Sequence, residues 1–166
     1  FVSLEAKELE KNYAVKTKGI TIGNLIWQVK LDQDTYTTSI NLNSKGPLSL
    51  VYNFKGYYET NGIIQNDILI PNTYIQEWKT KNKQRNINLV FKKSKIVDLN
   101  IQPEEKEVER INFLELEGYN DPLTSFLNIF LNNLDSKTID GRRIYVLSPN
   151  KSKDYTKVLI KNYINI

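Results

Sequence analysis

Six glutamates between residues 104 and 117 form one group of side chains whose type and spacing could do chemistry. Carboxylate oxygens bind divalent cations, and a pair of carboxylates can hydrolyse a glycosidic bond. Acidic runs of this kind are more often a solvated loop or one face of a short helix, and we favour that interpretation. We therefore expect no catalytic residue, no metal site and no cofactor. The glutamates are Glu104, Glu105, Glu107, Glu109, Glu115 and Glu117.

Two of the 4 arginines stand side by side after a turn at Asp140 and Gly141, in a chain that has 19 lysines. The choice of arginine at Arg142 and Arg143 indicates a need for planar, bidentate hydrogen bonding. Neighbouring residues of a strand face opposite sides, so only one of the two points inward. We favour an internal salt bridge, to Asp140, Asp121 or a glutamate, and the alternative is an anionic group of a ligand.

A basic stretch covers residues 79 to 95 and contains no acidic residue. Its charges suit an anionic membrane surface or lipid headgroup. Single-stranded nucleic acid would suit them too, since Trp78 and Phe91 are close, but the sequence has no nucleic-acid motif and we do not favour that partner. We expect peripheral membrane contact through four of these side chains: Lys79, Lys81, Lys83 and Arg85.

Aromatic side chains could line a groove for a lipid or a sugar, since amphipathic rings suit half-wet cavities. The alternative is that they are core residues or cross-strand pairs. The candidate ligand-binding residues are Trp27, Tyr52, Phe54, Phe126 and Phe130, together with Arg142 and Arg143.

The composition excludes several classes of chemistry, because histidine, cysteine and methionine are all absent. Without them there is no Ser-His-Asp or Cys-His catalysis, no zinc site of cysteine and histidine, and no disulfide. A primary translation product begins with methionine, so we expect a processed chain. Residues 1–12 are interpreted as the remnant of a secretory signal peptide or as a frayed N-terminus.

Apolar residues alternate with polar ones from Tyr13 onward, which predicts half-buried β-strands. Leu25 to Leu31 keep one phase, whereas Ile20 and Ile22 take the other, so we expect a bulge or bend near Gly23. Further strands are expected at 35–43, 48–59, 63–70, 86–93 and 95–101, with turns at 44–47, 60–62 and 93–95.

One segment has helical rather than strand periodicity. Apolar residues recur every three or four positions from Leu123 to Leu134, with Asp121 as the N-cap and Pro122 at the first helical position. We therefore expect a mainly β fold: a curved antiparallel sheet or half-open β-barrel wrapped around one amphipathic helix over residues 121–134. Residues 13–166 are expected to form this single domain, and the natural chain to extend beyond Ile166.

Several stretches resemble, in order, an exported bacterial family catalogued as domain of unknown function 3108. The sharpest matches are the helix start at 121–127 and the turn at 140–145. The resemblance implies a mostly β protein of the Gram-negative periplasm, without an assigned activity, cofactor or catalytic residue. The other matching stretches are 13–15, 19–23 with Trp27, 44–46, Pro71 with Tyr74, and 88–91.

From these patterns we expect a non-catalytic protein of the cell envelope. It would bind an apolar or amphipathic ligand, such as a lipid, in a groove between sheet and helix. One alternative is an envelope-assembly module that docks another protein. The other is an enzyme that acts on envelope polysaccharide through carboxylates.

Overall fold

The computed structural model describes residues 7–104 and 117–131. Within these ranges the chain forms seven strands and two helices. They are β1 (Lys7–Thr17), β2 (Ile20–Leu31), β3 (Thr35–Ser44), α1 (Leu48–Val51), β4 (Lys55–Gln65), β5 (Ile68–Lys79), β6 (Gln84–Lys92), β7 (Lys95–Gln102) and α2 (Pro122–Leu131).

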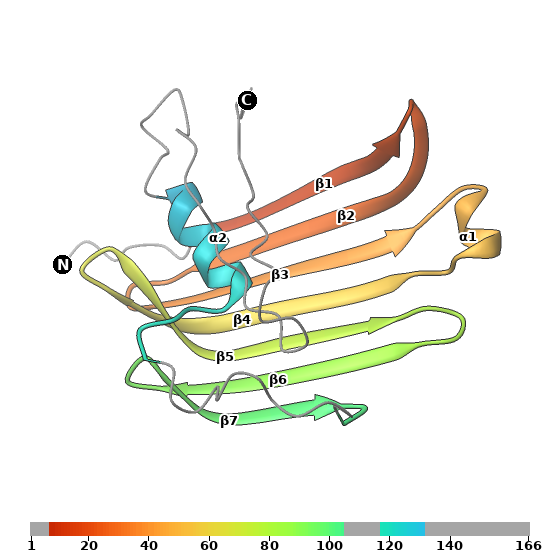
Figure 1. Cartoon of the computed structure of the whole chain (residues 1–166). Helices are drawn as coiled ribbons and strands as arrows, with labels where there is room; N and C mark the ends of the chain where they lie inside the picture. Colours follow the sequence, from red (N-terminus) through yellow and green to blue (C-terminus); the bar gives the residue numbers. More distant parts are fainter. Residues whose placement is uncertain (1–6, 105–116, 132–166) are drawn as a thin grey trace.

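The seven strands form one antiparallel sheet in the order of the sequence, from β1 to β7 (Figure 1). The predicted mainly β fold with an antiparallel sheet is confirmed. The sheet is open and uncurled, with β1 and β7 at its two edges, instead of the curved sheet or half-open barrel that we expected. Helix α2 lies on one face over β3, β4 and β5, and we call this the inner face. Residues 132–134 of the expected helix lie outside the described residues.

The expected bulge near Gly23 is confirmed. Val15 pairs with Gly23 and Lys16 pairs with Thr21, so Ile22 is an extra residue in β2. One bulge in an edge hairpin changes the direction of that hairpin alone. The register also shifts between Asn61 and Gly62 and between Val90 and Phe91, and the sheet nevertheless stays open.

The turn expected at residues 60–62 is wrong, because β4 continues through it, with a shift in its register against β5 between Asn61 and Gly62. The chain turns instead at Asn66 and Asp67, which both have positive φ, as the two central residues of a type I′ turn require. Gly62 serves a close approach of backbones: a Cβ there would lie 2.0 Å from the carbonyl oxygen of Ile70. This glycine therefore marks tight packing inside a hairpin, and the expected strand 63–70 is the hairpin itself.

The strand expected at 48–59 is also partly wrong, since residues 48–51 form the single turn of α1. Gly46 has a φ of 69°, and its carbonyl accepts hydrogen bonds from the Ser49 N–H at 3.1 Å and the Ser49 hydroxyl at 2.8 Å. Pro47 lies directly before α1, where a backbone N–H would have no partner within the helix, so its missing N–H loses no hydrogen bond. The alternation of Leu48 and Leu50, which predicted a strand, therefore belongs to a helical turn. Strand β4 starts only at Lys55.

The core lies between α2 and the inner face of the sheet. One cluster joins Trp27, Tyr36, Leu69 and Leu127, and the other joins Tyr74, Phe91, Ile96 and Leu123. Leu127 and Leu69 are each only 1% exposed, so α2 and β5 are in tight contact. The helix thus buries the apolar stripe that its sequence predicted.

Asn128 of α2 takes the place of a neighbouring strand beside β5. Pairing between β5 and β6 begins only at Thr73, so the backbone of Leu69 has no strand partner on that side. The Leu69 N–H donates to Asn128 Oδ1 at 3.0 Å, and Asn128 Nδ2 donates to the Leu69 carbonyl at 3.1 Å. One carboxamide therefore satisfies a donor and an acceptor on a residue that is almost fully buried.

We expect Asn128→Ala to lower the free energy of unfolding by about 2 kcal/mol, since an unpaired buried backbone group costs about 1–3 kcal/mol. Urea denaturation followed by circular dichroism measures the change. Ser125→Ala is the matched control, because Ser125 lies one turn earlier on α2. Both substitutions put alanine into the helix and raise its helix propensity by a similar amount. An equally small loss for both variants would contradict the role assigned to Asn128.

Candidate functional site

Three of the predicted ligand-binding residues come together in the core. Trp27 packs edge to face against Phe126 and Phe130, with ring centroids 5.4 and 5.2 Å apart. Its indole N–H donates to the hydroxyl of Thr38 at 2.9 Å, and the side chain is only 5% exposed. In the described part of the chain, these residues fill the space between sheet and helix instead of lining a groove there.

Tyr52 and Phe54 lie far from that cluster, at the end of the sheet where α1 is found. Tyr52 stacks on Phe54, and Phe54 stacks on Trp78 of β5, each with centroids 6.4 Å apart. Tyr52 is 49% exposed. The predicted aromatic set is therefore divided between a packed core and a half-exposed stack.

The remaining predicted residues are placed only in part. Arg142, Arg143 and residues 105–116 lie outside the described residues. Glu117 forms an ion pair with Lys95 at 3.0 Å, with both side chains more than half exposed. Over residues 7–104 and 117–131, no three acidic side chains gather closely enough to hold a metal ion.

A buried polar cluster joins the start of α2 to the centre of the sheet. Asp121 caps the helix as predicted, since its Oδ1 accepts the N–H groups of Leu123 and Thr124 at 2.9 and 3.0 Å. Its Oδ2 accepts the hydroxyl of Thr124 at 2.5 Å and that of Thr60 at 3.0 Å. The hydroxyl of Tyr36 lies 2.6 Å from that of Thr124.

The hydroxyl of Thr60 has more acceptors than it has protons. It lies 2.9 Å from the carbonyl oxygen of Thr73 and 3.0 Å from Asp121 Oδ2, and a hydroxyl donates only one hydrogen. An ionised Asp121 competes with Thr73 for this proton. A protonated Asp121 can donate instead, which leaves Thr60 free to bond Thr73.

Burial raises the pKa values in this cluster. Desolvation raises the pKa of Asp121 above its ordinary value of 3.8, against hydrogen bonds from Thr124, Thr60 and Leu123 that lower it. Desolvation also raises the pKa of Tyr36 to about 12, so its phenol stays protonated. Thr60 and Thr124 are 0% exposed and Asp121 is 2% exposed. A substrate cannot reach these groups, and their role is to fix α2 on the sheet.

Sequence reasoning identified Asp121 but missed Thr60 and Tyr36. The signal was present, because Thr38 and Thr60 are polar residues on the inner phase of their strands. A buried hydroxyl needs a hydrogen-bond partner, and the helix cap supplies one.

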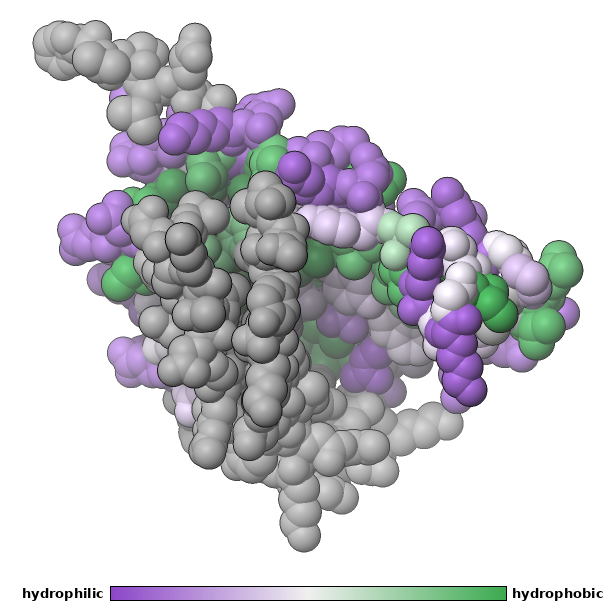
Figure 2. All heavy atoms as spheres, turned by 90° about the horizontal axis from the view of Figure 1, so that it is seen from above, coloured by the Kyte–Doolittle hydropathy of each residue, from purple (hydrophilic) through white to green (hydrophobic). Residues whose placement is uncertain are grey.

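Helix α1 presents a second surface that sequence reasoning missed. Leu50 is 87% exposed and Val51 is 81% exposed, because the single turn projects beyond the end of the sheet. Figure 2 shows apolar and polar atoms side by side at this end of the molecule. A hollow of about 410 Å³ lies beside α1. It is lined by Ser49, Leu50, Asn53, Lys55, Lys79, Thr80 and Lys81.

The two ends of the sheet differ in charge. At the α1 end, the connections between β1 and β2, β3 and β4, and β5 and β6 contain no acid. At the opposite end, the other three connections carry the acids Asp32, Asp34 and Asp67 and one lysine, Lys93. The exposed apolar turn therefore stands in basic surroundings. The lysines of the α1 end are Lys18, Lys45, Lys81 and Lys83.

We expect Asp121→Asn to change how stability depends on pH. Between pH 3.8 and the raised pKa of Asp121, the folded state binds more protons than the unfolded state, so this group's stabilising contribution falls as pH rises. An asparagine at this position would not titrate. The free energy of unfolding of the unmodified protein, minus that of the variant, should be largest below pH 3.8 and should decrease towards neutral pH.

Urea denaturation at a series of pH values measures this difference. An increase towards neutral pH would contradict the prediction, because it would mean that the hydrogen bonds to the carboxylate outweigh its desolvation.

No helix in the described part of the chain is long and apolar enough to cross a membrane. No curated protein and no solved structure matches the chain. A protein-family model does match, over residues 12–159 of the 166. This match confirms the resemblance seen in the sequence, and the chain belongs to the family described as "Protein of unknown function (DUF3108)".

Proposed function

We propose that this protein is a non-catalytic, periplasmic binding protein that docks reversibly on an anionic lipid surface through α1. The observation that carries the proposal is the exposure of Leu50 and Val51 on a projecting turn with lysines around it. Contiguous exposed apolar side chains rimmed by polar residues are a feature of sites that bind membranes or other proteins. The amphipathic ligand expected from the sequence is here a membrane surface instead of a molecule enclosed between sheet and helix.

The chemistry of this end fits the boundary between headgroups and acyl chains. Leu50 and Val51 can enter the apolar layer, while Tyr52 has the amphipathic ring that suits the interface. Lysines near an anionic surface contribute about 1 kcal/mol each, and burial of a large aliphatic side chain contributes about 1.5–3 kcal/mol. Such contributions support reversible binding and fall well short of a membrane anchor.

The charge distribution also sets the orientation of the protein on the surface. The α1 end carries the lysine-rich connections, and the acidic connections lie at the opposite end. An anionic surface attracts the first end and repels the second. Of the side chains predicted for membrane contact, Lys79 and Lys81 line the hollow beside α1, and Lys83 follows in the same turn.

We expect Leu50→Asp/Val51→Asp to weaken binding to vesicles by about tenfold or more. The variant removes both aliphatic side chains from the interface and adds two negative charges. The measurement is co-sedimentation with vesicles of equal parts phosphatidylglycerol and phosphatidylcholine, compared with vesicles of phosphatidylcholine alone. The unmodified protein should bind the first kind, should bind the second kind much less, and should be released by salt.

Ile68→Asp is the matched control, because Ile68 is 54% exposed at the opposite end of the sheet. It should bind vesicles as the unmodified protein does. Equal binding by the α1 variant, or no preference for anionic vesicles, would refute the proposal.

A further inference from the structure

The face of the sheet opposite α2, which we call the outer face, carries an ordered array of polar side chains. The strand register aligns them in two neighbouring rows across β3, β4, β5 and β6. The first row is Asn43, Lys55, Lys79 and Gln84. The second row is Asn41, Tyr57, Glu77 and Asn86.

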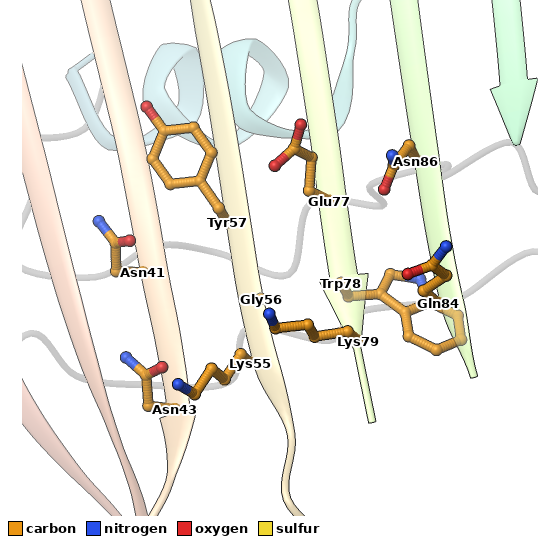
Figure 3. A pocket seen from close by; sticks show the side chains of 10 residues that line it. All are labelled: Asn41, Asn43, Lys55, Gly56, Tyr57, Glu77, Trp78, Lys79, Gln84 and Asn86. Atoms are coloured by element: carbon orange, nitrogen blue, oxygen red, sulfur yellow. The ribbon is translucent and has the colours of Figure 1, made fainter. Parts of the chain in front are cut away.

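These two rows line a groove of about 300 Å³. Figure 3 shows the side chains standing on one face, with α2 behind the sheet and Trp78 directed to the other side. Four strands spaced by about 4.8 Å make the groove roughly 14 Å long across the sheet. This length suits a short chain of linked rings and exceeds what a single small anion needs.

Lys55 and Lys79 lie directly opposite each other on neighbouring strands. Like charges in this position destabilise a sheet. Lys92 and Lys95 are also opposite each other, but Lys95 has an ion pair with Glu117. Over residues 7–104 and 117–131, no carboxylate lies within ion-pair distance of Lys55 or Lys79. An anionic group bound between them would relieve their repulsion.

Four carboxamides surround this lysine pair, from Asn41, Asn43, Gln84 and Asn86. Each carboxamide both donates and accepts hydrogen bonds, as the hydroxyls of a sugar also do. Asn24 pairs with Asn43 at the end of the first row but does not line the groove, and its Oδ1 is buried with no hydrogen-bond partner among the described residues.

Tyr57 supplies an aromatic ring within the second row. Its hydroxyl donates to the carboxylate of Glu59, which holds the ring in place. Burial, the hydrogen bond to Glu59 and the charges of Glu59 and Glu77 together raise the pKa of Tyr57 to about 12. The phenol therefore remains a neutral donor, and the ring offers an apolar surface inside a polar groove.

We propose that this groove binds an acidic oligosaccharide. A carboxylate of the sugar lies between Lys55 and Lys79, its hydroxyls bond the carboxamides, and one sugar ring packs on Tyr57. The lysines extend across the sheet: Lys79 reaches towards β4 and Lys55 towards Asn43 (Figure 3). Lys55 and Lys79 also line the hollow beside α1, whereas the carboxamides that complete the site belong to the outer face. The two sites therefore share these lysines and differ in their other residues.

The test titrates isotope-labelled protein with trigalacturonate and follows the side-chain amide signals of Asn41, Asn43, Gln84 and Asn86 by NMR. The fully methyl-esterified trisaccharide is the matched neutral ligand, and inorganic phosphate is the matched simple anion. We expect shifts of these amide signals with trigalacturonate and binding at least about tenfold weaker for either control ligand. Absence of the shifts, or equal binding of the ester or of phosphate, would overturn the proposal.

Two variants divide the site into its charged and neutral parts. Lys55→Gln/Lys79→Gln should weaken trigalacturonate binding by about tenfold or more, and Asn41→Ala/Asn86→Ala should weaken it without removing a charge. Lys92→Gln/Lys95→Gln removes the same number of charges from another cross-strand lysine pair, outside the groove, and should bind normally. Leu50→Ser/Val51→Ser removes the aliphatic side chains of α1 without adding charge near Lys55 and Lys79, and it should also bind normally, which separates this proposal from lipid docking. Equal loss in all four variants would overturn the proposed site.

Discussion

The contact between the N-terminus of α2 and the centre of the sheet is the constraint on which the rest of the described structure depends. Asp121 caps its own helix and at the same time accepts a hydrogen bond from Thr60 of β4. Tyr36 of β3 joins the same cluster through Thr124. A helix that rested on apolar contacts alone could slide along the sheet, because such contacts are non-directional. The buried polar cluster fixes its position, since each displacement would leave a buried donor or acceptor unpaired.

Successive side chains of a β-strand point to opposite faces, so the two faces of this sheet can have separate roles. Tyr57 and Tyr58 are adjacent in β4, but Tyr58 packs in the core and Tyr57 belongs to the outer groove. Replacing residues of one face leaves the side chains of the other face in place. A polar outer face can therefore carry carboxamides and lysines in rows without unpaired polar groups entering the core.

The sequence predicted those features that depend on local chemistry. Asp121 followed by Pro122 and a helical apolar stripe led to the correct helix start, and alternation led to an antiparallel sheet. It could not predict features that depend on register. Asn61 followed by Gly62 is a sequence typical of a turn. These two residues lie inside a strand, and the reason is seen only in the packing of Ile70 and Tyr36 against Gly62. The groove is a similar case, because Asn41 and Asn86 are far apart in sequence and share a row only through two intervening strands.

Stability and exposed chemistry are concentrated at opposite ends of the sheet. Asn128 of α2 bonds the backbone of Leu69, close to the turn at Asn66 and Asp67, so the helix secures the end remote from α1. The α1 end depends on hairpin pairing and on the stack of Phe54 and Trp78. Helix α2 does not pack on the α1 end of the sheet. This end can therefore carry exposed aliphatic side chains and neighbouring lysines, which a packed region would exclude. A surface or ligand that binds these side chains in the folded state stabilises the protein by mass action. Binding at this end should therefore raise the free energy of unfolding while leaving the cluster around Asp121 unchanged.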